Sequence, residues 1–395
     1  MEKSTNNIRN RIVSIDITRG LVMLIMAIDH IRDLMYNAPL NQNPLDLSVT
    51  TPGLFFTRWI THLCAPIFVF LSGASAYLSF KRKQNVSYSR NFLITRGIWL
   101  IILEFTLITF AVWADIHFRI FMLQVIATIG FGFIILSFLL KLTPKTIMIM
   151  GLVIVLGHDL IQTLLANQQF PGKSELAPLL VFTVIPLGAK TILLIAYPIL
   201  PWLGIMLLGF GTGKLFEMDL QERKKFLLRV GILLVAFFII LRWSNLYGDP
   251  FQWKIKNTVF FTFLSFINVS KYPPSLLYTL ITLGIMCFIL YISESASNYL
   301  SRILIVYGKV PLFYYLLHWY LIHTIMFLIL FAEGFHTTDL FPNESSFGRP
   351  LRPNGVSLPV MYLIWLSVII ILYPLCKWYG KYKADHPEKK WLSYL

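Results

Sequence analysis

The chain has 395 residues, of which 56% are hydrophobic and only 13% are charged, about half the charged fraction of a typical soluble domain. Its net charge is +15, from 34 Lys and Arg against 19 Asp and Glu. The basic residues are scattered between apolar blocks, whereas a nucleic-acid-binding surface gathers them on one face, so we exclude that class. Many apolar blocks are about 20 residues long, enough to cross a hydrocarbon core about 30 Å thick. The composition therefore predicts a polytopic membrane protein.

We expect an all-α fold, a membrane helix bundle of about ten transmembrane helices that forms one domain over residues 1–395. The expected spans are 12–36, 52–80, 92–113, 118–140, 145–166, 189–215, 226–243, 273–293, 302–332 and 356–379. The polar amino terminus lacks the small-residue site of a cleavable signal peptide, so we expect the first span to be retained.

The charges between the spans predict which side each connection occupies. Lys and Arg are retained on the cytoplasmic side of inserted helices. They are more frequent in alternate connections, for example at 81–83 and 223–225, and again in the tail from 377 to 390. We therefore expect both termini to be cytoplasmic and the protein to be a multi-pass protein of the cell (inner) membrane.

The histidines are unevenly distributed along this topology. Seven of the eight fall in the outer half of a span or in an external connection, namely His30, His62, His117, His158, His318, His323 and His336. Ionisable side chains inside a membrane are costly and usually mark a functional site. The distribution predicts a polar chamber that opens to the outside.

Two of these histidines are candidates for acid–base chemistry. His30 follows Asp29 near the outer end of the first span, and His62 lies where the next span begins its return. Consecutive antiparallel spans are usually neighbours, so we expect His30 and His62 at one level. An imidazole held by a carboxylate is a good general base near neutral pH. We predict His30 as the base and Asp29 as its orienting group; the alternative for either histidine is a buried structural role.

His318 and His323 are five residues apart in one span, which separates them by roughly 140° around a helix. Both cannot face one pocket, so we favour His318 for the chamber and a structural role for His323. The sequence contains neither an HExxH motif nor Cys and His at ligand spacing, so we expect no metal.

On the cytoplasmic side, Arg19, Arg96 and Lys214 lie close to the expected inner boundary. Such a basic rim suits the phosphates of a cytosolic nucleotide carrier. The glycine run 209–213 before Lys214 lacks the strand-to-helix context of a phosphate loop and favours close helix packing. Glu104, midway through the third span, is either a buried hydrogen-bonded acid or part of a polar conduit.

Five stretches together carry a family resemblance: 11–30, with RIVSIDITRG and AIDH; 61–73, THLCAPIFVFLSG; 197–204, YPILPWLG; 271–277, KYPPSLL; and 308–323. In this order the chain resembles the heparan-alpha-glucosaminide N-acetyltransferase-like membrane proteins, within the transmembrane acyltransferase superfamily. The resemblance implies a membrane enzyme that takes an acyl group from cytosolic acyl-CoA and delivers it to a sugar-like acceptor on the far side. The stretch around 37–43, where the animal lysosomal enzyme has its active histidine, contains none here, and Asp29 matches an asparagine of that enzyme.

We therefore expect an acyl-CoA-dependent O- or N-acyltransferase, in the first place an acetyltransferase with acetyl-CoA as co-substrate. His30 would deprotonate the acceptor, and His62 or His318 would position it or stabilise the oxyanion. The expected partners are membrane lipid, the acyl-CoA, a glycan or other sugar-like acceptor, and a second copy of the chain in a homodimer. One alternative is a proton-coupled small-solute transporter that uses the same histidines; another is a non-catalytic lipid- or envelope-binding subunit.

Overall fold

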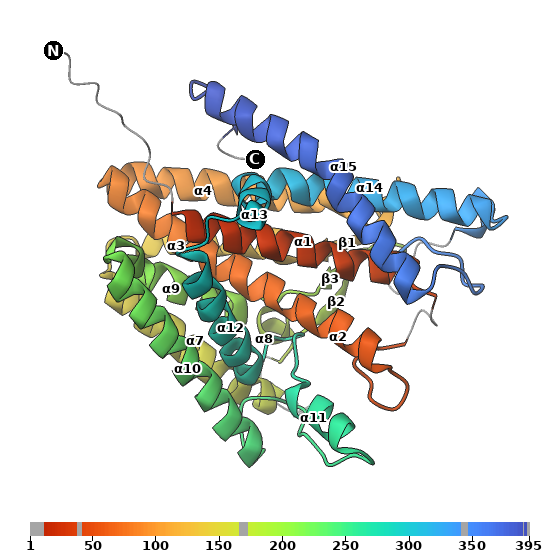
Figure 1. The fold of residues 1–395 in the computed structure, drawn as a ribbon, viewed down its shortest axis with the longest axis horizontal. Helices are drawn as coiled ribbons and strands as arrows, with labels where there is room; N and C mark the ends of the chain where they lie inside the picture. The colour runs from red at the N-terminus through yellow and green to blue at the C-terminus, as the bar shows by residue number, and fades with distance from the viewer. Residues whose placement is uncertain (1–11, 38–41, 166–172, 341–346, 390, 393–395) are drawn as a thin grey trace.

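The structure, a computed structural model, describes residues 12–37, 42–165, 173–340, 347–389 and 391–392. Figure 1 shows a bundle of long helices in which α1 runs through the middle, between α15 and α14 on one side and α7, α10 and α12 on the other. Arg11 and the polar amino terminus, and residue 166 at the end of the fifth expected span, lie outside the described residues.

Helices make up most of the described chain, which confirms an all-α, polytopic helix bundle. The longer ones are α1 (Val13–Met35), α3 (Cys64–Lys83), α4 (Val86–Leu103), α6 (Val125–Leu139), α7 (Pro144–Leu165), α9 (Ile199–Gly211), α10 (Leu220–Ser244), α12 (Leu276–Ser293), α13 (Tyr299–Lys309), α14 (Pro311–Ala332) and α15 (Leu358–Asp385). The shorter ones are α2 (Pro52–Ile60), η1 (Thr61–Leu63), η2 (Glu104–Ile108), α5 (Thr109–Trp113), α8 (Lys173–Leu180), η3 (Gly213–Glu217), α11 (Val259–Ile267) and η4 (Thr337–Asp339).

Among the described residues, eight of the ten expected spans contain a helix that is long and apolar enough to cross a membrane. The two others are the first and fourth spans. The first, α1, is 23 residues long but carries five charged side chains. The fourth contains only the 15-residue α6, because residues 120–123 before it form a strand.

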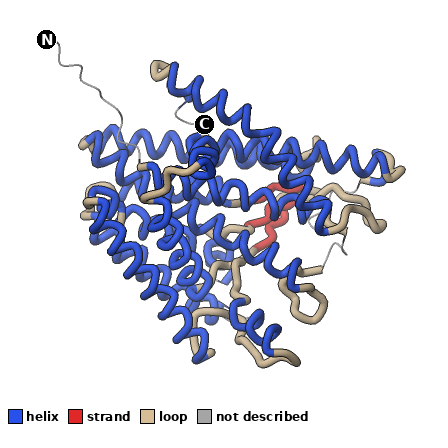
Figure 2. Tube along the Cα trace, viewed as in Figure 1, coloured by secondary structure: helices blue, strands red, loops and turns tan. Residues whose placement is uncertain are grey.

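Three short strands form a sheet that we did not expect from the sequence: β1 (Ile120–Leu123), β2 (Thr183–Pro186) and β3 (Ile192–Ile195). Their order is β1-β3-β2, with β1 parallel and β2 antiparallel to β3. Figure 2 shows this sheet in red among the helices. Residues 120–123 and 192–195 were therefore wrongly included in transmembrane helices.

Helix α1 is the centre of the packing and contacts α3, α12, α13, α14 and α15. Its closest neighbour is α13, where a Cβ added to Gly20 would overlap the backbone of Leu304, and one added to Gly308 would overlap that of Asp16. Only glycine permits this approach of two helix backbones. The contact places the end of α13, and therefore Lys309, near Arg19 of α1, which we expect on the cytoplasmic side.

Candidate functional site

Two cavities lie end to end along α1. The first, which we call the Asp29 cavity, has a volume of about 450 Å³ and contains Asp29, His30, Arg58, Lys271 and Tyr272 in its lining. The second, which we call the basic cavity, has a volume of about 330 Å³, and its charged lining residues are Arg19, Arg96, Lys309 and Lys383. Both volumes lie in the lower part of the range usual for small-molecule sites, about 300–1,000 Å³.

The carboxylate of Asp29 is the centre of a buried charge cluster. Arg58 Nη1 lies 3.0 and 2.7 Å from its two oxygens, and Arg32 Nη1 lies 2.6 Å from Oδ1. Lys271 Nζ is farther away, 3.9 Å from Oδ2. A second carboxylate, that of Asp33, lies 2.6 Å from Nη2 of Arg32. Three cations thus face two carboxylates in this cluster.

Arg58 reaches the cluster because a well-capped helix begins six residues before it. The hydroxyl of Thr51 accepts a hydrogen bond from the backbone N–H of Leu54, and Pro52 occupies the first turn of α2. This cap and the proline are typical of a helix start. Arg58, one turn before His62, pairs with Asp29 and lines the cavity, whereas His62 does not line it.

Lys271 and Tyr272 reach the cavity from the segment that precedes α12. The carboxylate of Asp159 accepts from the N–H of Leu276, and the ring Nε2 of His158 lies 2.7 Å from the carbonyl oxygen of Pro274. These two α7 residues fix the start of α12. The structure therefore assigns His158, one of the histidines of the expected chamber, to holding this segment in place.

A further carboxylate, that of Asp249, fixes the same segment from its other end. It accepts from the N–H of Ser270 at 2.8 Å and from the hydroxyl of Ser275 at 2.7 Å. Burial raises the pKa of the Asp249 carboxyl, although these hydrogen bonds and Arg242 act to lower it. Residues 270–276 are thus held at both ends, which fixes Lys271 and Tyr272 beside Asp29.

The Tyr272 side chain is 41% exposed and lines the Asp29 cavity. Its hydroxyl lies 3.5 Å from that of Tyr197, and the Lys271 ammonium lies 5.0 Å from the centre of its ring. Desolvation acts to raise the pKa of the Tyr272 phenol, but the positive charges of Lys271 and Arg58 outweigh it, and the pKa is lowered. Sequence reasoning missed Arg58, Lys271 and Tyr272, which come from segments distant from His30.

His30 lines the Asp29 cavity, as expected for a functional histidine. Its ring packs on the indole of Trp319, with 3.9 Å between centroids, and lies 5.2 Å from the ring of His318. Among the described residues no hydrogen bond joins it to the carboxylate of Asp29, which is occupied by Arg58 and Arg32. Among the described residues, the contacts that hold the His30 imidazole are its ring packing on Trp319 and His318 of α14.

The structure places His62 and His318 behind the cavity wall. His62 is 1% exposed, and both of its ring nitrogens lack a hydrogen-bond partner among the described residues. His318 is fully buried against Tyr314, with its Nδ1 3.2 Å from the Tyr314 carbonyl oxygen. Neither residue lines the Asp29 cavity or the basic cavity.

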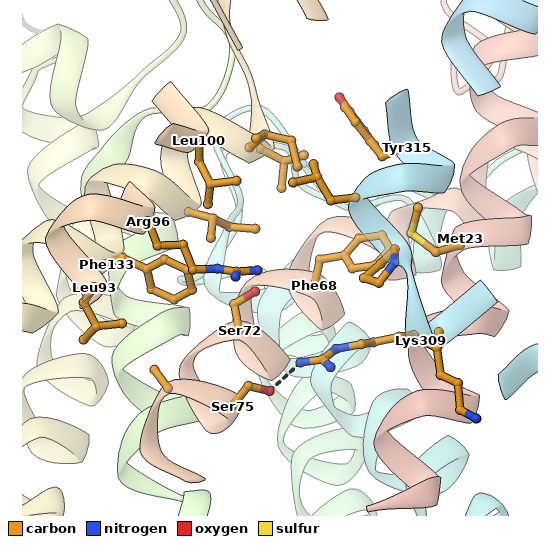
Figure 3. A pocket seen from close by; sticks show the side chains of 18 of the residues that line it. Met23, Phe68, Ser72, Ser75, Leu93, Arg96, Leu100, Phe133, Lys309 and Tyr315 are labelled. Atoms are coloured by element: carbon orange, nitrogen blue, oxygen red, sulfur yellow. Dashed lines mark hydrogen bonds between the residues drawn. The ribbon is translucent and has the colours of Figure 1, made fainter. Parts of the chain in front are cut away.

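The basic cavity brings together two of the three cations expected at the inner boundary, Arg19 and Arg96. Figure 3 shows Arg96 reaching into it from α4, and Ser72 and Ser75 of α3 below. Arg19 donates to the carbonyl oxygen of Leu71 at 3.1 Å and to the hydroxyl of Ser75. The apolar part of the lining includes Met23, Leu100, Ile129 and Phe133.

Lys309 and Lys383, from the ends of α13 and α15, complete the charged lining of the basic cavity, and the sequence reasoning missed both. The third expected cation, Lys214, is exposed on η3 and lines neither cavity. The glycine run before it does pack closely: an added Cβ at Gly209 would overlap the backbone of Phe70. This supports the packing interpretation of that run.

Four residues line both cavities: Met26, Phe68, Val125 and Tyr315. The position of Val125 depends on Glu104, whose carboxylate accepts from the N–H of Ala127 at 2.9 Å, in the first turn of α6. Carboxylates are stabilising at helix N-termini. Glu104 is therefore a buried, hydrogen-bonded acid. The four side chains that line both cavities, which we call the shared wall, lie where the two cavities meet.

The lining of the two cavities defines the chemistry that the site can carry out. The basic cavity can bind an anion with an apolar extension, and the Asp29 cavity offers an imidazole in a polar, charged chamber. Within the described residues, no three His, Cys, Asp or Glu side chains gather closely enough to hold a metal ion. A membrane helix bundle with two adjoining cavities of this kind suits transfer of a group between two substrates.

Comparison with known proteins agrees with this class. The family model described as heparan-alpha-glucosaminide N-acetyltransferase, catalytic, matches residues 11–248. Since the match covers more than half of the chain, the protein belongs to this family, and membership makes it a multi-pass membrane protein of an acetyltransferase family. No curated protein matches the chain.

Proposed function

We propose that the protein transfers an acetyl group from acetyl-CoA, bound in the basic cavity, to an amine or hydroxyl of a sugar-like acceptor in the Asp29 cavity. The observation that carries this proposal is the shared wall: two cavities with different linings meet at Met26, Phe68, Val125 and Tyr315. A donor in one cavity and an acceptor in the other would bring their reacting ends together where the cavities meet.

The lining of the basic cavity supports an acyl-CoA donor. CoA combines negative phosphates with a slender pantetheine arm, and Arg and Lys are the usual phosphate ligands of proteins. Lys309 is exposed, whereas the apolar lining residues Leu100 and Phe133 are buried. We therefore place the phosphates at the Lys309 end of the cavity and the acyl-pantetheine end against the shared wall.

In the Asp29 cavity we assign His30 as the general base. Its imidazole takes the proton from the acceptor nitrogen or oxygen as that atom attacks the thioester carbonyl, and returns a proton to the CoA thiolate. Asp29, whose carboxylate already accepts from Arg58, acts by holding the three cations in place rather than by orienting the imidazole. Trp319 supplies the packing that orients His30.

We further propose that the basic cavity opens to the cytoplasm and the Asp29 cavity to the opposite side. The excess of Lys and Arg in alternate connections supports this orientation. Of the features that suggested the two sides, Arg19 and Arg96 of the basic rim line the basic cavity, and His30 of the outer histidines lines the Asp29 cavity.

The test is acetyl transfer by purified protein and by its His30→Ala variant. Acetyl-CoA is the donor, glucosamine and methyl glucosaminide are the probe acceptors, and release of the CoA thiol is measured. Removing a positioned general base lowers turnover by about 10² to 10⁴. The same variant should keep the thermal stabilisation that acetyl-CoA gives to the wild-type protein, since that ligand binds in the other cavity.

His117→Ala is the matched control, because His117 is exposed in the turn before β1 and lines neither cavity. Wild-type turnover in His30→Ala would contradict the assignment of the base. Absence of any stabilisation by millimolar acetyl-CoA would contradict the donor site and favour the transporter alternative.

A further inference from the structure

The wall between the cavities contains one polar side chain. Of the four described residues that line both cavities, Met26, Phe68 and Val125 are apolar, and Tyr315 carries a hydroxyl. If a donor in one cavity reacts with an acceptor in the other, its thioester carbonyl lies where the two cavities meet, beside these four residues. Its oxygen gains negative charge in the transition state, and a hydrogen-bond donor at that point stabilises it.

The position of Tyr315 on α14 fits this task. The residue is 3% exposed, so its ring is held by the surrounding protein. Figure 3 shows the ring above the basic cavity, with the hydroxyl pointing away from Arg96 and Lys309. One helical turn farther along α14, on the same face, Trp319 lines the Asp29 cavity and packs on His30 with 3.9 Å between ring centroids. The hydroxyl and the proposed base are thus presented by neighbouring turns of one helix.

We propose that Tyr315 is a catalytic residue whose hydroxyl donates a hydrogen bond to the carbonyl oxygen of the acyl donor and stabilises the oxyanion. This inference rests on the proposed function. As the acceptor nitrogen or oxygen forms its bond to the carbonyl carbon, the π electrons move to the oxygen facing Tyr315, and the acceptor proton passes to His30. When the carbonyl re-forms, the carbon–sulfur bond breaks, the sulfur leaves with the electron pair, and His30 returns the proton to it.

The assignment replaces the oxyanion role that the sequence suggested for His62 or His318. Both of those side chains lie behind the wall of the Asp29 cavity and line neither cavity. Thr61 and Gln124 line the Asp29 cavity, and Ser72 lines the basic cavity, but none of the three lines both. Among the described residues, Tyr315 is the one side chain with a hydroxyl that lines both cavities.

The experiment compares Tyr315→Phe with Tyr314→Phe in the full-length protein. Tyr314 is the adjacent tyrosine, fully buried, without a hydrogen-bond partner for its hydroxyl among the described residues, and outside both linings. Loss of one oxyanion donor costs about 10² to 10³ in kcat. We expect this loss in Tyr315→Phe, with the KM for glucosamine and the stabilisation by acetyl-CoA unchanged, and near-wild-type kcat in Tyr314→Phe.

A second measurement observes the hydrogen bond itself. Infrared difference spectra of bound acetyl-CoA, labelled with ¹³C at the thioester carbonyl, should show this band at lower wavenumber than in water for the wild type and Tyr314→Phe. The band should return toward its solution position in Tyr315→Phe. If that variant does not fold, a wild-type band at or above the solution position contradicts the inference.

The outcomes separate this inference from the function on which it rests. If the wild type transfers acetyl groups and Tyr315→Phe keeps a kcat within about threefold, the role of Tyr315 is overturned and the proposed function stands. If the wild type neither binds acetyl-CoA nor releases CoA with the probe acceptors, the proposed function fails, and the role of Tyr315 fails with it.

Discussion

The Nη1 atom of Arg58 lies 3.0 and 2.7 Å from the two carboxylate oxygens of Asp29, so that a cation of α2 and an anion of α1 are joined beside the Asp29 cavity. Arg32 binds the same carboxylate at 2.6 Å. The main role of a carboxylate with two such partners is to stabilise the fold, because its removal leaves the positive charges of buried arginines without a neutralising partner.

We predict that Asp29→Asn destabilises the protein. Removing one partner of a buried ion pair costs about 3–5 kcal/mol, so the thermal unfolding temperature in detergent should fall markedly. Asp33→Asn is the matched control: Asp33 also pairs with Arg32, but its side chain is 34% exposed, and exposed pairs contribute about 0–1 kcal/mol. Equal unfolding temperatures for the two variants would contradict the structural role of Asp29.

A second prediction concerns Glu104. Glu104→Leu removes the acceptor for the N–H of Ala127, and an unpaired buried N–H costs about 1–3 kcal/mol. Glu104→Gln keeps an acceptor oxygen, so it should unfold at a temperature closer to that of the wild type and retain most of the acetyl transfer. A folded Glu104→Gln protein without activity would instead indicate the polar conduit that the sequence left as the alternative.

A third prediction tests the donor site through its charges. Arg96→Ala and Lys309→Ala each remove a cation from the basic cavity. A hydrogen bond to a charged group contributes about 1.5–3 kcal/mol, so each variant should raise the Kd for acetyl-CoA about tenfold or more, as measured by calorimetry. Lys214→Ala, which removes an exposed lysine outside the cavity, should leave the Kd unchanged. A loss of affinity in Lys214→Ala alone would place the donor elsewhere.

The membrane character, most of the spans and the position of His30 in a polar cavity could be predicted because each depends on a local pattern. Hydrophobic runs specify helices, and His30 is marked by its depth within one helix. The charge cluster could not be predicted, because Arg58 and Lys271 meet Asp29 only in the folded chain. The sequence does contain a feature that could have marked each residue as part of the site. Arg58 precedes His62 by one turn at the start of an apolar span, and Lys271 begins one of the stretches that carry the family resemblance.

The sheet and the full basic cavity were missed for other physical reasons. Strands β1 and β3 are four residues each within apolar runs, and periodicity alone does not distinguish such a strand from a buried helix segment. Lys309 and Lys383 come from the ends of two helices, where lysines are expected for topology alone. The convergence of Lys309 with Arg19 depends on the close approach of α13 to α1 at Gly20.

The central claim, transfer of an acetyl group between two cavities that open to opposite sides of the membrane, is tested most directly in sealed vesicles. Purified protein is reconstituted with glucosamine inside, and acetyl-CoA labelled in its acetyl group is added outside. We predict that labelled N-acetylglucosamine accumulates inside while the CoA remains outside, and that His30→Ala vesicles form almost none. Product that forms only when both substrates are on the same side, or labelled acetyl-CoA that enters the vesicles intact, would contradict the account.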